Sequence, residues 1–163
     1  DPYTISDVLI NIIENYRKKK IYFGNIIILL PTSPFFLSKD IKKSIKLFNK
    51  SKKDCLISIS KTDFPIFNGY ILKKNNSIDF CFKNSKYKDK KSTECPDTYK
   101  SNGGITIVKC SKFIKTKNLH SLAKIGYESK NWSFIDIDNL IDYKLSKLVF
   151  NKYFKKDNIN FYV

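Results

Sequence analysis

Apolar side chains recur along the chain with two different periods, which predict helices and strands in turn. Between Ser6 and Lys20 they lie at helical spacing, with Thr4 or Ser6 as the residue that caps the helix. The run Ile26–Leu30 is short, continuous and rich in isoleucine, which is typical of a buried strand. We therefore expect a helix followed by a core strand.

The next segments repeat this order. Ser38 is expected to cap a helix over Lys39–Lys50, whose apolar residues share one helical face. Cys55–Ser60 then has the length and composition of a strand. This β-helix-β order indicates a parallel α/β sheet.

The middle of the chain follows a different pattern. Two short apolar segments, Ile66–Leu72 and Ile78–Phe82, flank the polar sequence 73–76 and predict a β-hairpin. A lysine- and serine-rich stretch follows, Lys83–Glu94, and it predicts a flexible loop.

The last third returns to strands and helices. We expect a strand at Ile105–Val108, a short helix at Lys112–Thr116, strands at Gly126–Glu128 and Ser133–Ile137, and a closing helix at Leu140–Tyr153. The remaining residues, Lys155–Val163, mix charge and aromatic rings and predict a frayed tail or an edge strand.

Length and composition predict a single folded domain over residues 1–163. The hydrophobic share of 42% is enough to form a core. The net charge of +16 is compatible with nucleic-acid binding, but 30 of the 31 basic residues are lysine and only Arg17 is arginine. Proteins that read nucleic acids rely on arginine, whose planar guanidinium grips phosphate and guanine at two points. We therefore expect a solvated lysine surface, partly available to substrate phosphates, and no specific nucleic-acid partner.

The four cysteines are widely spaced and His120 is the only histidine, so the sequence has no zinc signature. Small buried thiols in a reducing compartment are the simpler interpretation. The longest uninterrupted apolar run, Ile26–Leu30, is too short to cross a bilayer, and no signal peptide is visible. We expect a cytoplasmic protein without membrane contact.

Pro31-Thr32-Ser33-Pro34 follows the first predicted strand. Ligands of open α/β sheets bind at the carboxyl ends of strands, so the hydroxyls of Thr32 and Ser33 lie where a substrate would be held. An ordinary strand-to-helix turn explains the same residues.

A second polar segment, Tyr99–Gly104, precedes the strand at Ile105–Val108. Paired glycines, Gly103 and Gly104, permit positive φ and a close approach of a ligand to the backbone. The amide of Asn102 both donates and accepts hydrogen bonds, which suits a polyhydroxylated sugar. A plain turn is the alternative.

Asp136 and Asp138 form the third candidate group. In a strand at Ser133–Ile137 their side chains would share a face. Two carboxylates on one face repel unless a cation lies between them, and oxygen ligands without a nearby histidine suit Mg²⁺. The alternative is a pair of surface or capping aspartates, with Asp138 capping the last helix and Asp142 supporting its start.

The three motifs, in this order, resemble the C-terminal two-thirds of the acylneuraminate (CMP–sialic acid) cytidylyltransferases over residues 1–153. That family has a similar Pro-Thr-Ser-Pro after its central strand. It also has a Tyr-x-x-Asn-Gly segment beside its sugar pocket, matched by Tyr99 and Asn102, and an Asp-x-Asp that binds catalytic magnesium, matched by Asp136 and Asp138.

The resemblance implies a Rossmann-like α/β fold of the nucleotide-diphospho-sugar transferase type, with helices on both faces of the sheet. It implies an inserted dimerisation arm at 64–95 and hence a homodimer. The implied reaction transfers CMP from CTP to a sialic-acid-like nonulosonate and releases pyrophosphate, with Mg²⁺ as cofactor. The catalytic and metal-binding residues would be Asp136 and Asp138, and the substrate-binding residues Thr32, Ser33, Tyr99, Asn102 and Gly103.

The family's opening strand and Gly-rich loop, which hold CTP, have no counterpart in residues 1–30, and the chain contains no methionine. We therefore expect an N-terminally incomplete enzyme that lacks the first βαβ portion. Two other classes stay open. One is a non-catalytic remnant or dimerising fragment, and the other, less favoured by composition, is a basic nucleic-acid binder with steep salt dependence.

Overall fold

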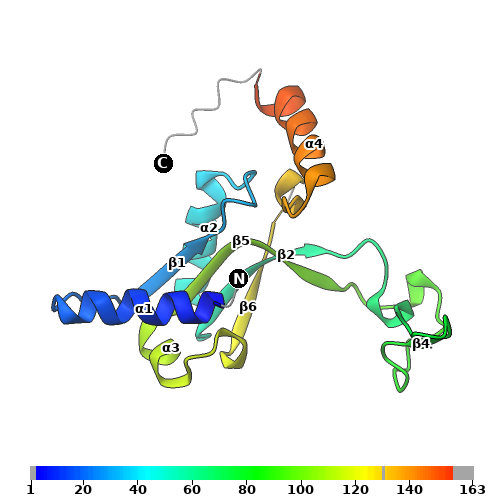
Figure 1. The fold of residues 1–163 in the computed structure, drawn as a ribbon, viewed down its shortest axis with the longest axis horizontal. Helices are drawn as coiled ribbons and strands as arrows, with labels where there is room; N and C mark the ends of the chain where they lie inside the picture. Colours follow the sequence, from blue (N-terminus) through cyan, green and yellow to red (C-terminus); the bar gives the residue numbers. More distant parts are fainter. Residues whose placement is uncertain (1–2, 130, 156–163) are drawn as a thin grey trace. The chain divides into compact units, whose positions relative to one another are not determined.

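The computed structural model describes residues 3–129 and 131–155. The chain forms two compact units, Asp1–Ile59 with Ser101–Val163, and Ser60–Lys100 (Figure 1). The long strands β2 (Cys55–Lys61) and β5 (Tyr99–Lys109) pass from one unit into the other.

The larger unit holds a four-stranded sheet of order β1-β5-β2-β6. Its other elements, in chain order, are α1 (Ile5–Lys18), β1 (Asn25–Leu29), α2 (Ser38–Lys50), α3 (Cys110–Thr116), the 3₁₀ turn η3 (Leu119–Ser121), β6 (Lys124–Glu128), the 3₁₀ turn η4 (Asn131–Phe134), α4 (Leu140–Val149) and the π-helical turn η5 (Phe150–Phe154).

The sheet is mixed, whereas the β-helix-β order indicates a parallel sheet. β1 pairs antiparallel with β5, with Leu29 opposite Ile105, whereas β2 pairs parallel with β6. The N–H of Lys109 donates to the carbonyl of Asp54, and the N–H of Ile105 donates to the Ser58 hydroxyl, so β5 and β2 also run in opposite directions. β1 and β2 do point the same way, as the β-helix-β order predicts, but β5 lies between them.

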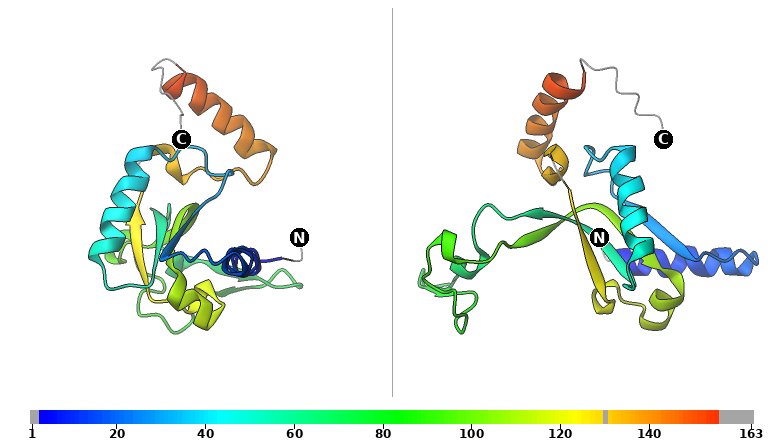
Figure 2. Two further views of the ribbon diagram at one scale, coloured as in Figure 1. Left: turned by 90° about the vertical axis from the view of Figure 1, so that its left-hand side faces the viewer. Right: turned by 180° about the vertical axis from the view of Figure 1, so that it is seen from behind.

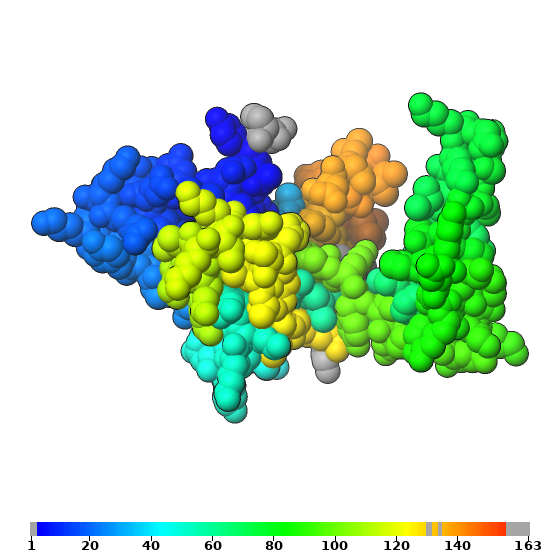
Figure 3. All heavy atoms as spheres, turned by 90° about the horizontal axis from the view of Figure 1, so that it is seen from below, coloured from blue at the N-terminus to red at the C-terminus, as the bar shows by residue number. Residues whose placement is uncertain are grey.

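Helices cover both faces of this sheet. On one face, Leu9 and Ile13 of α1 and Phe113 of α3 pack with Cys55 and Val108. Figure 3 shows α3 (yellow-green) against α1 (blue). On the other face, Phe48 of α2 packs with three buried strand residues, Leu56, Ile105 and Ile107. Figure 2 shows α1 and α2 on opposite sides of the strands.

The start of α1 is set by its sequence. The Thr4 hydroxyl accepts from the N–H of Asp7, and the Asp7 carboxylate accepts from the N–H of Thr4 at 2.8 Å and from its hydroxyl at 2.6 Å. These hydrogen bonds lower the pKa of the Asp7 carboxyl. Of the two capping residues that the sequence allows, Thr4 is the one used.

β1 is a strand, as predicted, but it is not buried. In the sheet of the described residues it stands at one edge, and the side chains of Ile27 and Leu29 are 39% and 49% exposed. A continuous run of isoleucines therefore marks a strand that lies on one layer of helices and leaves its second face open.

The strand predicted at Ser133–Ile137 is wrong. Residues Asn131–Phe134 form η4, and the following residues up to Asn139 have no regular structure. Asn139 then caps α4, its side chain accepting from the N–H groups of Ile141 and Asp142. The predicted closing helix Leu140–Tyr153 is divided into α4 and η5, and the predicted tail lies outside the described residues beyond Lys155.

The smaller unit contains the predicted hairpin. β3 (Tyr70–Leu72) pairs antiparallel with β4 (Ile78–Phe80), with Tyr70 opposite Phe80 and Leu72 opposite Ile78. The 3₁₀ turns η1 (Ile66–Asn68) and η2 (Ser92–Glu94) flank it, and the lysine-rich stretch between β4 and η2 consists of turns.

Among the residues that the structure describes, no helix combines the length and apolar character needed to cross a bilayer.

The burial of two thiols predicts the order of cysteine reactivity. Cys55 and Cys110 are buried, and burial raises the pKa of both thiols, so that both stay protonated near neutral pH. Cys81 is exposed. Iodoacetamide is expected to modify Cys81 at least about tenfold faster than Cys55 or Cys110, as followed by peptide mass mapping. Equal rates in the native protein would contradict this packing.

Gly104 predicts a large effect of one added methyl group. A Cβ at this position would lie only 1.7 Å from Cε2 of Phe36, whose ring packs against the core cluster that contains Phe48 of α2. A Cβ at Gly24 would meet nothing within 4 Å. Gly104→Ala is therefore expected to lower the free energy of unfolding by about 1–3 kcal/mol. The matched control, Gly24→Ala, should stay within about 0.5 kcal/mol of the unsubstituted protein in urea denaturation.

Candidate functional site

The turn after β1 brings the Pro-Thr-Ser-Pro motif to the carboxyl end of that strand. The N–H of Ser33 donates to the carbonyl of Leu30 at 3.1 Å and closes the turn. Thr32 is exposed, whereas Ser33 is buried, with 6% of its surface accessible. Phe35, two residues on, packs with Ile135 and anchors the turn to the later segment.

The Asp-x-Asp segment lies directly on this turn. The N–H of Ile137 donates to the carbonyl of Thr32 at 2.9 Å, which fixes the backbone beside Asp136. The Ser33 hydroxyl lies 3.3 Å from Oδ1 of Asp136. Two motifs more than a hundred residues apart are thereby joined by one backbone and one side-chain hydrogen bond.

The two aspartates differ in environment. Asp136 is half-buried and Asp138 is exposed. The prediction that the side chains of Asp136 and Asp138 share a face required a strand at 133–137. These residues do not form a strand, so the structure gives that prediction no support. Asp138 is not the helix cap, since Asn139 has that role. Asp142 does support the helix start, accepting from the N–H groups of Asp138 and Asn139.

Gly103 gives the Asp136 carboxylate its space. Its φ of +72° is in the region that favours glycine, which the sequence permits at either member of this pair, and Gly104 does not use it. A Cβ there would lie 3.0 Å from Oδ2 of Asp136 and 3.3 Å from Oγ of Ser33. The close approach of these two side chains to the β5 backbone therefore requires glycine.

Asn102 forms one cluster with Ser33, Gly103 and Asp136. It is 3% exposed, and its backbone carbonyl accepts from the Ser33 hydroxyl at 3.0 Å. Its side-chain oxygen accepts from the hydroxyl of Ser58 at 2.5 Å, and its side-chain nitrogen donates to the hydroxyl of Ser129 at 2.6 Å. The amide predicted to face a sugar is thus engaged with hydroxyls of β2 and of the residue after β6.

Ser129 is a residue that sequence reasoning missed. Its hydroxyl donates to the carbonyl of Ile59 at 3.2 Å, which links the end of β6 to β2. No motif surrounds it in the sequence, and its role depends on strand order alone. Ser58, on β2, is buried, and its hydroxyl accepts from the N–H of Ile105 at 2.8 Å.

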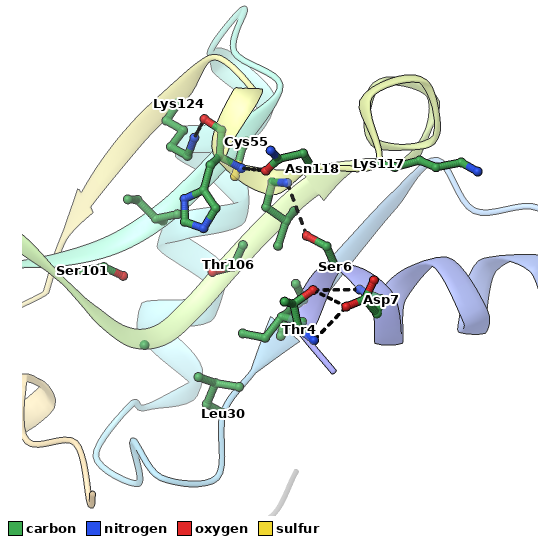
Figure 4. Close-up of a pocket in the computed structure, with 16 residues that line it drawn as sticks. Thr4, Ser6, Asp7, Leu30, Cys55, Ser101, Thr106, Lys117, Asn118 and Lys124 are labelled. Carbon is green, nitrogen blue, oxygen red and sulfur yellow. Dashed lines mark hydrogen bonds between the residues drawn. The ribbon is translucent and has the colours of Figure 1, made fainter. Parts of the chain in front are cut away.

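A cavity of about 700 Å³ adjoins the cluster and shares Gly103 and Leu30 with it. Figure 4 shows its wall, with Thr4, Ser6 and Asp7 from the start of α1 facing Cys55 and Asn118, and with Leu30 at one end. Its lining is mainly apolar and includes polar side chains, among them Lys117, His120 and Lys124. Such a lining suits a small organic ligand with polar groups.

The turn is also anchored at its far end. Asp40, in the first turn of α2, accepts from the N–H of Leu37 at 3.1 Å and from the hydroxyl of Tyr127 at 3.0 Å. Burial, followed by the hydrogen bond to Asp40 and its charge, raises the pKa of Tyr127 to about 12. The phenol therefore stays a neutral donor that ties α2 to β6.

Tyr99 begins β5 in the smaller unit and is 40% exposed. Within the larger unit the structure brings together Ser33, Asn102, Gly103 and Asp136, with the backbone of Thr32. Among the described residues, no group of three or more histidine, cysteine, aspartate or glutamate side chains is arranged to hold a metal ion.

The chain resembles known proteins both in sequence and in fold. The chain is 27% identical over 125 residues to an N-acylneuraminate cytidylyltransferase from Escherichia coli O18:K1:H7 (strain RS218 / NMEC). The match covers 73% of this chain and 28% of that protein, so the chain spans less than a third of its relative's length. No protein-family model matches the chain.

In fold, the chain is similar to a 4-diphosphocytidyl-2C-methyl-D-erythritolsynthase from Anaerococcus prevotii DSM 20548. The TM-score is 0.57 at 10% sequence identity, over 92% of this chain and 68% of that one. The expected α/β fold of nucleotidyltransferase type, with helices on both faces of the sheet, is confirmed. The chain is thus similar in sequence to a cytidylyltransferase and in fold to a second protein.

Proposed function

We propose that this chain is part of a cytidylyltransferase that transfers CMP from CTP to a sialic-acid-like nonulosonate. The observation that carries the proposal is the convergence of three motifs on one cluster, in which Ser33, Gly103 and Asp136 meet beside a cavity large enough for a nucleotide or a sugar. The similarity to an N-acylneuraminate cytidylyltransferase supports this choice of substrates.

In the proposed reaction the anomeric hydroxyl of the sugar acid loses its proton to solvent and attacks the α-phosphate of CTP. An oxygen–phosphorus bond forms, the bond to the β-phosphate oxygen breaks, and pyrophosphate leaves. The protein's contribution is to hold the two substrates in line and to balance the charge of the triphosphate. We assign the adjoining cavity, which begins at Gly103 and Leu30, to substrate binding.

The donor set fits Mg²⁺. Asp136 and Asp138 would supply carboxylate oxygens, and magnesium typically binds to proteins through one or two carboxylates together with substrate phosphates. Oδ2 of Asp136 packs close to Gly103, where a Cβ would lie only 3.0 Å away. When bound, the ion would neutralise the triphosphate and stabilise charge on the leaving pyrophosphate. Thr32 is exposed beside this carboxylate segment, and we assign it to substrate contact.

We propose that the smaller unit is a dimerisation arm. One face of its hairpin carries Tyr70, Leu72, Ile78 and Phe80, and the first three of these are more than half exposed. A two-stranded ribbon is marginally stable alone and gains stability by packing its apolar face. A second copy of the chain would cover this face.

The four free cysteines are consistent with a cytoplasmic location.

The catalytic assignment is tested in the full-length natural polypeptide. Asp136→Asn and Asp138→Asn are each expected to lower the rate of CMP-sugar formation by at least about 100-fold, because each removes charge from the metal site. The measurement is pyrophosphate release from CTP with N-acetylneuraminate. The control, Glu14→Gln, changes an exposed carboxylate on α1 and should leave the rate unchanged.

Full activity in both aspartate variants would refute the metal site. No activity in the unsubstituted full-length protein, with intact fold and with related nonulosonates also tried, would favour a non-catalytic remnant.

The dimer is tested by sedimentation equilibrium. Leu72→Lys places a charge in the apolar face of the hairpin and is expected to raise the dimer dissociation constant by at least about tenfold. Ile141→Lys is the matched control, since Ile141 is 77% exposed on α4, outside the arm. A monomeric unsubstituted protein, or equal dissociation in both variants, would exclude this interface.

A further inference from the structure

The hydroxyl of Ser33 is placed to act on Asp136 and not on a substrate. We propose that Ser33 is a positioning residue, which holds the Asp136 carboxylate in the orientation that binds a divalent cation. This inference rests on the proposed function, because it assigns a role toward the metal site suggested there. It also changes the role that the sequence suggests for Ser33, which was contact with the substrate.

The first argument is the direction of the Ser33 side chain. Ser33 is 6% exposed, and its hydroxyl oxygen has two acceptors within reach, the carbonyl of Asn102 at 3.0 Å and Oδ1 of Asp136 at 3.3 Å. A serine hydroxyl has one proton to donate. Shared between these two acceptors, that proton is used inside the cluster and is not offered to a ligand.

The second argument is that the backbone is fixed independently of the hydroxyl. The N–H of Ile137 donates to the carbonyl of Thr32 at 2.9 Å, and the N–H of Ser33 donates to the carbonyl of Leu30 at 3.1 Å. Both bonds survive removal of the Ser33 hydroxyl. What the hydroxyl adds is therefore control of the Asp136 side chain.

The third argument is the enclosure of the carboxylate. Oδ1 faces the Ser33 hydroxyl, and Oδ2 lies close to Gly103, where a Cβ would be only 3.0 Å away. One oxygen is held by a donor, and the other packs closely against the backbone of a glycine. A carboxylate held in this way before a cation arrives loses less conformational freedom on binding, and a better-ordered ligand binds more tightly.

The experiment is a titration of the 163-residue chain with Mn²⁺, used as a paramagnetic probe and followed by broadening of the backbone amide signals of residues 135–138. Ser33→Ala is expected to raise the Mn²⁺ concentration for half-maximal broadening about three- to tenfold. Ser44→Ala is the matched control, because Ser44 is also a buried serine whose hydroxyl donates to a backbone carbonyl, that of Ile41 at 2.8 Å. It should leave the titration unchanged.

A second measurement needs no metal. The scalar couplings of the Asp136 β-protons report its χ1 rotamer, and we expect one rotamer in the unsubstituted protein and in Ser44→Ala but averaging in Ser33→Ala. Ser33→Cys keeps the shape of serine with a weak donor, and it replaces the alanine variant if that one does not fold. We expect it to shift both readouts in the same direction.

The outcomes separate the two proposals. Broadening and couplings that are equal in Ser33→Ala and the unsubstituted protein overturn the role of Ser33 and leave the proposed function untouched. Absence of broadening in the unsubstituted protein, or broadening that persists unchanged in Asp136→Asn, overturns the metal site and with it the positioning role.

Discussion

The antiparallel insertion of β5 between β1 and β2 is the constraint on which the candidate site depends. Leu29, the last residue of β1, lies opposite Ile105. Residues 102–104, which precede Ile105, therefore come beside residues 30–33, which follow Leu29. A parallel β5 would carry the Asn-Gly-Gly segment to the opposite end of the sheet. One reversal of strand direction thus brings two distant motifs together.

The polar side chains at this end of the sheet must be hydrogen-bonded if their burial is not to destabilise the fold. A buried hydroxyl or amide without a partner costs about 1–3 kcal/mol. The side chains of Ser33, Ser58, Asn102 and Ser129 meet this condition by bonding to one another and to strand backbone. The arrangement also fixes which way the Asn102 amide faces, because one partner donates to it and the other accepts from it. Order at the site and stability of the sheet end therefore come from the same hydrogen bonds.

The success of the sequence-based predictions differs between elements for physical reasons. The start of the helix after Thr4 was predictable, because capping acts within a few residues. The helix Ser38–Lys50 was predictable from its apolar spacing alone, since Ser38 is its first residue and not its cap, and the cap position is occupied by Leu37 without a side-chain hydrogen bond. The strand at 133–137 was mispredicted, because Ile135 and Ile137 alternate with polar residues as a strand would. In the fold Ile135 instead packs with Phe35 and Val149, and Asn139 starts a helix immediately afterwards. Local alternation was outweighed by a tertiary contact and a cap.

The burial of β1 was misjudged for a related reason. Its isoleucines predict a strand correctly, but a side chain's neighbours depend on where the strand stands in the sheet, and β1 stands at an edge of the described sheet. At the site, the residue types indicated which positions are polar, but they did not indicate which partners those side chains would bond to. Asn102 was recognised as a polar residue beside glycines, and its engagement with Ser58 and Ser129 needed the order β5-β2-β6.

By itself the sequence determined the features that depend on near neighbours. These are the start of the helix after Thr4, the hairpin, the freedom of the pair Gly103 and Gly104 to adopt a positive φ, and the presence of three polar motifs. The tertiary structure alone decided the direction of β5, the junction of Ser33 with Asp136, the partners of Asn102 and the cavity beside them. The reason is that capping and turn preferences act over a few residues of chain, whereas strand order and direction are set by the packing of apolar faces contributed by the whole chain.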